Sequence, residues 1–95
     1  YDLSVHFIDV GKADGIYIRC NGKHILIDSG DVEYSGTVTN YLKRQGVEVL
    51  DMVVATHFDR DHIGGMANVL MEFEVKRFLM PDWKNTTFLT RIIFR

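Results

Sequence analysis

The strongest constraint on the fold is an alternation of β-rich runs with segments of helical spacing. Residues 16–20 (IYIRC) and 24–28 (HILID) are β-rich and are joined around Asn21-Gly22. An Asn-Gly pair between such runs is the strongest short-range signal for a β-hairpin. Residues 3–10 (LSVHFIDV) alternate apolar and polar side chains, which predicts a further strand before the hairpin. The chain is therefore expected to begin with three strands.

A helix and a buried strand are predicted next. Val38, Tyr41 and Leu42 recur at helical spacing, and Gly46 is typical of a helix end. Residues 51–56 (DMVVAT) are apolar on both faces, as in a strand that is covered on both sides.

The remainder of the chain predicts one more helix and one more strand. One helical face carries the next apolar residues, Ile63, Met66, Leu70 and Phe73. Residues 75–80 (VKRFLM) have strand character, and we expect Pro81 to end that strand. The tail, residues 88–95 (FLTRIIFR), fits a helix or a strand, and we favour a helix. The order β-β-β-α-β-α-β, followed by this tail, predicts α/β layering.

The size and composition indicate one domain or part of one, spanning residues 1–95. No apolar run approaches the about 20 residues of a membrane helix. Because the chain starts at Tyr1 rather than Met, we expect a piece of a longer protein, and localisation stays open between the cytoplasm and the cell surface. The single Cys20 excludes an internal disulfide and a cysteine-rich zinc site.

A cluster of potential metal ligands follows the buried strand directly. Residues 56–65 read THFDRDHIGG, with the ligand-type side chains His57, Asp59, Asp61 and His62. Sites in open α/β sheets form where strands end. In a loop, this spacing can direct His57 and Asp59 to one point, and Asp61 and His62 to a second point nearby. Imidazole and carboxylate suit Zn²⁺, Mn²⁺ or Fe, and two neighbouring metals can activate a water together.

The alternative is a solvated polar loop in which Asp61 is an ordinary helix N-cap. Four ligand-type residues within six positions favour the metal site. A calcium loop fits less well, because Ile63 and Leu70 would occupy positions where that loop needs carboxylates.

These residues resemble a known family. HFDRDH resembles the H-x-[HD]-x-D-H signature of the metallo-β-lactamase fold. VHFIDVGKADGIYI, ILIDSG and LDMVVATHFDRDHIGG resemble three blocks of that family, in the same order, over residues 5–65. Asp59, where a second histidine is commoner, is similar to the ComEC-like branch, which includes the DNA-uptake competence protein and stand-alone relatives. GKADG departs from the family's GQGDA, although Asp14 keeps its motif position.

The resemblance implies the N-terminal half of an αββα sandwich from a metal-dependent hydrolase, with phosphodiesters or nucleic acid as the expected substrates. It implies two divalent ions, Zn²⁺ or Mn²⁺, with His57 and Asp59 on the first and Asp61 and His62 on the second. A metal-bound hydroxide would be the nucleophile. Asp61 is also the candidate catalytic residue, because without this ligand the bound water would be poorly activated. With a net charge of −2, substrate phosphates would be held by the metals rather than by a basic surface.

Two further aspartates are assigned to the surroundings of this site. In the family, the residue that matches Asp28 supports the metal loop from outside the ligand set. The alternative for Asp28 is a turn-forming role beside Ser29-Gly30. Asp14 is expected at the site mouth or as an ordinary turn residue.

The family's second half supplies further ligands, and no histidine follows His62 here. The resemblance therefore covers the first half of the family domain only. We expect the 95-residue chain alone to be inactive, to bind metal weakly, to make no direct membrane contact and to self-associate through the apolar faces of its strands. The alternative hypothesis is a non-catalytic fragment or interaction module, which keeps the motif but does not catalyse a reaction.

Overall fold

The computed structural model describes residues 2–11, 15–30, 32–56, 66–82 and 87–92. The strands are β1 (Leu3–Phe7), β2 (Ile16–Cys20), β3 (Lys23–Ile27), β4 (Val49–Leu50), β5 (Met52–Val54), β6 (Glu74–Val75), β7 (Arg77–Asp82) and β8 (Thr87–Ile92). The helices are η1 (Val32–Tyr34, one 3₁₀ turn), α1 (Ser35–Arg44) and α3 (Met66–Glu72).

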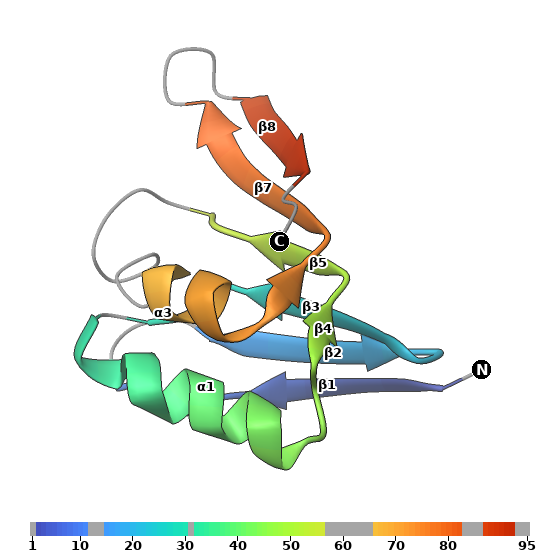
Figure 1. Cartoon of the computed structure of the whole chain (residues 1–95), viewed down its shortest axis with the longest axis vertical. Coiled ribbons are helices and arrows are strands. Elements are labelled where there is room, and N and C mark those ends of the chain that lie inside the picture. The colour runs from blue at the N-terminus through green and yellow to red at the C-terminus, as the bar shows by residue number, and fades with distance from the viewer. Residues whose placement is uncertain (1, 12–14, 31, 57–65, 83–86, 93–95) are drawn as a thin grey trace.

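Six strands form one mixed sheet in the order β1-β2-β3-β5-β7-β8. The β1/β2, β2/β3 and β7/β8 pairs are antiparallel, whereas β3, β5 and β7 run parallel to one another. The short strands β4 and β6 make a separate parallel pair. Both α1 and α3 lie against one face of the six-stranded sheet, and β7 with β8 projects beyond them (Figure 1). This mixed α/β layering confirms the predicted α/β class.

The core fills the space between the helices and the inner face of the sheet. One row of paired residues crosses that face from β2 to β5, namely Tyr17, Leu26 and Val53, all of them fully buried. Val38 and Leu42 of α1 and Met66 and Val69 of α3 pack in the same cluster. A buried side chain of this size contributes about 1.5–3 kcal/mol, so this contact holds the helical layer on the sheet.

The opposite face of the sheet, called the outer face below, is also apolar. Alternate residues of a strand point to opposite faces, so the side chains that are not in the inner rows form this surface. Its apolar side chains are Leu3, Val5, Phe7, Ile16, Ile18, Cys20, Ile25, Ile27, Met52, Val54 and Leu79, and Lys23 and Arg77 lie on the same face.

Local signals that were read from the sequence are confirmed. The β2–β3 hairpin turns at Asn21 and Gly22, with φ of 50° and 81°, as a type I′ turn requires. Helix α1 ends where expected: the N–H groups of Gly46 and Val47 donate to the carbonyls of Lys43 and Leu42 at 3.0 Å, which is a Schellman closure.

Three local predictions are corrected. Up to Ile92, the last described residue, the tail is a strand rather than a helix, because β8 pairs with β7 over six positions. Pro81 lies inside β7 and does not end it. At Pro81 the strand has passed the end of its pairing with β5, so the missing N–H can face away from a neighbour. Strand β5 is less covered than expected within the described part of the chain: Val53 is buried, whereas Met52 and Val54 are partly exposed.

Candidate metal centre

The candidate site lies at the edge of the sheet where the parallel strands end. Strands β1, β3 and β5 run in the same direction, since β2 is antiparallel to both β1 and β3. The segments that follow them, starting at Ile8, Asp28 and Ala55, therefore leave the sheet at one edge (Figure 1). In open α/β sheets this edge is where ligands bind.

Asp28 is the central described residue of this edge. Its side chain is almost fully buried, with the residue 2% exposed. One carboxylate oxygen accepts a hydrogen bond of 2.8 Å from the backbone N–H of Thr56, and the other accepts one of 2.6 Å from the Thr56 hydroxyl. The backbone N–H of Asp28 donates to the carbonyl of Val54 at 2.7 Å. Asp28 thus fastens the end of β3 to the end of β5, immediately before His57.

The backbone of Asp28 is held in an unusual conformation. Its φ is 59°, in the left-handed region that asparagine and aspartate enter more readily than other residues with a side chain. Such a conformation costs of order 1–3 kcal/mol and persists only when the surrounding contacts fix it. The three hydrogen bonds to Val54 and Thr56 are those contacts. A purely local turn role for Asp28 does not account for bonds to a residue 28 positions away.

The residues after Asp28 pack tightly against the loop that follows β1. Gly30 has φ +74°, and a Cβ there would stand 2.9 Å from Cβ of Val10. Only glycine allows this approach without displacement. Ser29 is fully buried, and its hydroxyl has no hydrogen-bond partner among the described residues. The three segments at this edge are therefore interlocked around Asp28.

The proposed ligands themselves fall outside the described part of the chain. His57, Asp59, Asp61 and His62, and also Asp14, lie in residues 12–14 and 57–65. Their assignment stays a prediction. Within the described ranges, no group of three or more His, Cys, Asp or Glu side chains could hold a metal ion.

The described surroundings place a buried carboxylate next to the start of the motif. A buried carboxylate is costly unless it is hydrogen-bonded or paired, and Asp28 is hydrogen-bonded to the residue that directly precedes the motif. Imidazole and carboxylate donors suit Zn²⁺ and Mn²⁺. Residues outside the ligand set that orient a ligand-bearing loop are a usual part of metal sites.

The two histidines outside the motif are bound within the fold. His6 on β1 hydrogen-bonds through its ring nitrogens to the hydroxyls of Tyr41 and Ser4. His24 on β3 bonds to the hydroxyl of Tyr17 at 2.7 Å. Both rings therefore make contacts within the fold.

Thr56 and a cleft at the opposite edge were not anticipated from the sequence. The signal for Thr56 was its place directly before His57.

The cleft, of about 420 Å³, is lined by Lys23, His24, Asp51 and Lys76 among others. The carboxylate of Asp51 accepts from the backbone N–H of His24 at 2.8 Å, with Lys76 Nζ 3.8 Å away.

Among the described helices, none is long and apolar enough to cross a membrane.

Comparison with known families gives one match over most of the chain. Residues 8–90 match the family described as the metallo-beta-lactamase superfamily. Three curated relatives are competence or recombination proteins. The chain is 34% identical to Recombination protein 2 of Haemophilus influenzae over 86 residues, 26% identical to ComE operon protein 3 of Bacillus subtilis over 95 residues, and 36% identical to Competence protein ComA of Neisseria gonorrhoeae over 69 residues. These alignments cover 85%, 81% and 72% of this chain but only 11%, 12% and 10% of the relatives.

Solved structures show the same fold. A Cronobacter sakazakii metallo-beta-lactamase with a HARLDQ motif superposes with a TM-score of 0.64 at 20% identity, over 75% of this chain and 29% of that one. The subclass B3 enzyme MEM-A1, from a soil metagenome library, gives a TM-score of 0.65 at 22% identity, over 74% and 27%. The chain thus corresponds to less than a third of these solved chains.

Proposed function

Because this chain belongs to the metallo-beta-lactamase superfamily, we propose that it forms the metal-binding part of a metal-dependent hydrolase. His57, Asp59, Asp61 and His62 are the proposed ligands for two divalent ions, Zn²⁺ or Mn²⁺. The observation that carries the proposal is the buried carboxylate of Asp28 bonded to Thr56, because it fixes the residue from which the ligand motif departs.

The proposed chemistry is hydrolysis of a phosphodiester, including one in nucleic acid. Bound divalent ions lower the pKa of water toward neutrality and stabilise the developing charge on a leaving oxygen. The competence and recombination relatives support this substrate class. A net charge of −2 supports it less directly, since phosphates would then be held at the metals rather than on a basic surface.

Within this proposal the chain's own residues have separate tasks. Asp28 and Thr56 position the start of the motif. The tight contact of Gly30 with Val10 keeps the segment after β1 close to the turn at Asp28. Asp14, which follows Val10 by four positions in the sequence, is the candidate for contact with substrate.

Metal analysis of the full-length protein, paired with hydrolysis assays, tests the proposal. We expect close to two divalent ions per chain, and activity on a chromogenic phosphodiester that is lost with a chelator and restored by Zn²⁺ or Mn²⁺. A chromogenic β-lactam serves as the comparison substrate. A full-length protein that retains no metal and hydrolyses neither compound would contradict the proposal.

The second candidate is a non-catalytic interaction module. It is favoured by the exposed apolar outer face, where Phe7 is 79% exposed. A full-length protein that binds a partner chain but lacks metal-dependent hydrolysis would support this candidate over the enzyme.

A further inference from the structure

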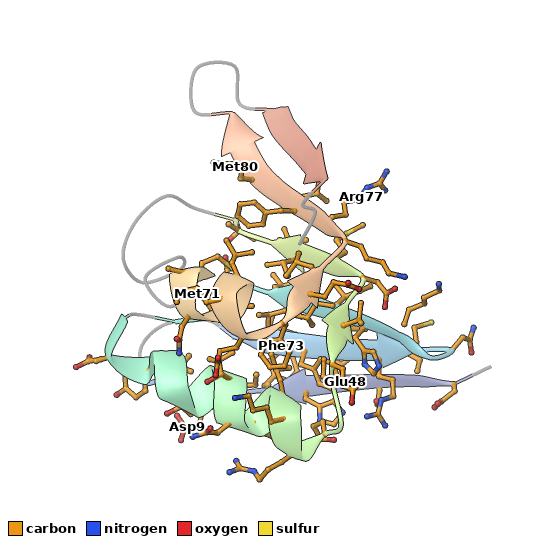
Figure 2. The ribbon with its side chains drawn as sticks, viewed as in Figure 1. Asp9, Glu48, Met71, Phe73, Arg77 and Met80 are labelled. Atoms are coloured by element: carbon orange, nitrogen blue, oxygen red, sulfur yellow. The ribbon has the colours of Figure 1, made fainter. Side chains whose placement is uncertain are left out.

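Four polar side chains lie in the described segments at the edge of the candidate metal centre. They are Asp9 after β1, Asp28 and Ser29 after β3, and Thr56 after β5. Asp28 and Thr56 bond to each other, and the exposed carboxylate of Asp9 accepts from the backbone N–H of Gly11 at 3.3 Å. Figure 2 shows Asp9 at the outside of the molecule, where water reaches it. Ser29 differs from the other three.

Ser29 is a buried polar residue without a partner. It has no exposed surface, and its hydroxyl makes no hydrogen bond to any described residue. The large majority of buried polar groups in folded proteins are paired, so an unpaired one requires a physical explanation. An unpaired buried hydroxyl destabilises a fold, whereas alanine fills nearly the same volume without that cost. Packing alone therefore does not explain a serine at this position.

The backbone on both sides of Ser29 is held in place. Asp28 has a φ of 59° and is tied to the end of β5 by three hydrogen bonds. Gly30 has a φ of +74° and lies tightly against Val10. A small backbone shift that would bring the Ser29 hydroxyl to a new partner is opposed by both neighbours. The hydroxyl therefore stays directly beside the residue that fixes the start of the ligand motif.

A ligand set that contains carboxylates supplies the acceptor that Ser29 lacks. Carboxylates that bind a metal are themselves hydrogen-bonded by residues outside the ligand set, and these bonds orient them. The proposed ligands include the carboxylates of Asp59 and Asp61. A serine hydroxyl has one proton to donate. The Thr56 hydroxyl already donates to Asp28, which leaves Ser29 as the unused hydroxyl donor among the described residues of this edge.

We propose that Ser29 is a positioning residue of the metal centre, whose hydroxyl donates a hydrogen bond to a carboxylate of the ligand set when the metals are bound. This inference rests on the metal site proposed above. It gives one hydroxyl two opposite effects. Unpaired in the metal-free protein, the hydroxyl lowers stability, and paired in the metal-bound protein, it strengthens metal binding. Asp28 has no such opposition, since its bonds to Thr56 already lie within the fold.

Ser29→Ala in the full-length protein tests this inference, because the substitution removes the hydroxyl and keeps the Cβ. We expect the melting temperature of the chelator-treated protein to rise by about 2–8 °C. We expect the affinity for Zn²⁺, measured by calorimetric titration, to fall by about 10–100-fold. Ser4→Ala is the matched control, because the Ser4 hydroxyl is bonded to the ring of His6 at 3.2 Å. It should not raise the melting temperature and should leave the Zn²⁺ affinity unchanged.

Two results would overturn the inference. A lower melting temperature of metal-free Ser29→Ala would mean that the hydroxyl is already paired in the fold, for example with a buried water. A higher melting temperature with unchanged Zn²⁺ affinity would mean that the hydroxyl does not contact the ligand set. In both cases the parent protein still binds Zn²⁺, so the proposed function stands. A parent protein that takes up no Zn²⁺ or Mn²⁺ would instead contradict the proposed function, and this inference with it.

Discussion

The carboxylate of Asp28 holds Thr56 by two hydrogen bonds, 2.8 Å from its backbone N–H and 2.6 Å from its hydroxyl. The bonds join the ends of two parallel strands, and the ligand motif starts at the next residue. Substitutions at Asp28 can therefore distinguish the contribution of this contact to fold stability from its contribution to metal affinity.

Asp28→Ala should destabilise the fold by about 2–4 kcal/mol, because it removes the acceptor for the part-buried N–H of Thr56 and places alanine at positive φ. Asp28→Asn should cost less, about 1 kcal/mol, since asparagine tolerates this φ and keeps an acceptor. Urea unfolding measures both. If the two variants are equally stable, the hydrogen bonds do not hold this edge.

Asp28→Asn should still weaken metal binding in the full-length protein, because it removes a negative charge beside the motif while preserving the fold. A reduction of about 10–100-fold is expected for a residue that supports ligands without binding the metal. Calorimetric titration with Zn²⁺ measures it. An unchanged affinity would assign Asp28 to folding alone.

Asp61→Ala should abolish hydrolysis by the full-length protein, since the proposed second metal would lose a ligand. Glu48→Gln is the matched control, because this exposed carboxylate lines the cleft at the opposite edge. Both the metal content and the rate of phosphodiester cleavage are measured. Activity of Asp61→Ala within a few-fold of the parent would show that the motif is not used.

Gly30→Ala and Gly22→Ala separate crowding from backbone strain. Both glycines have positive φ, but a Cβ at position 30 would lie 2.9 Å from Val10, whereas nothing lies within 4 Å at position 22. Gly22→Ala should cost about 1–2 kcal/mol from strain alone. Gly30→Ala should cost about 1–3 kcal/mol more, as overpacking does. Thermal and urea unfolding compare the two variants. Equal losses of stability would mean that Val10 moves aside at little energetic cost.

Tyr17→Phe should destabilise the fold by about 1–2 kcal/mol. The Tyr17 hydroxyl bonds to His24 and accepts from Arg19, in a residue with no exposed surface, and burial makes lost partners costly. Tyr41→Phe, which loses one bond to His6 on a partly exposed side chain, should cost less than about 1 kcal/mol. The reverse order of stabilities, measured by urea unfolding, would contradict the importance of the Tyr17 hydroxyl.

The sequence by itself determined the features that depend on neighbouring residues. The Asn21-Gly22 turn, the end of α1 at Gly46 and the alternation along β1 each follow from the conformations that these few residues allow. The ligand motif at residues 57–62 was read from residue types and spacing in the same way, and it stays a prediction because those residues lie outside the described ranges. The family resemblance followed from the same blocks, and residues 8–90 match that family.

Only the tertiary structure decided features that depend on distant atoms. The tail became a strand because β7 offered it a hydrogen-bonding edge, whereas its own composition fitted either state. The sequence of β5 predicted a strand that is covered on both faces. Whether a face is covered depends on the layers that pack against it, and the strand's own residues do not specify those layers. The sequence around Asp28 gave no sign of the hydrogen bonds that join its carboxylate to Thr56, 28 positions away. The physical reason is the same in each case: a residue's own conformational preference is local, but its hydrogen-bond partner and its burial are fixed by chain segments far away in the sequence.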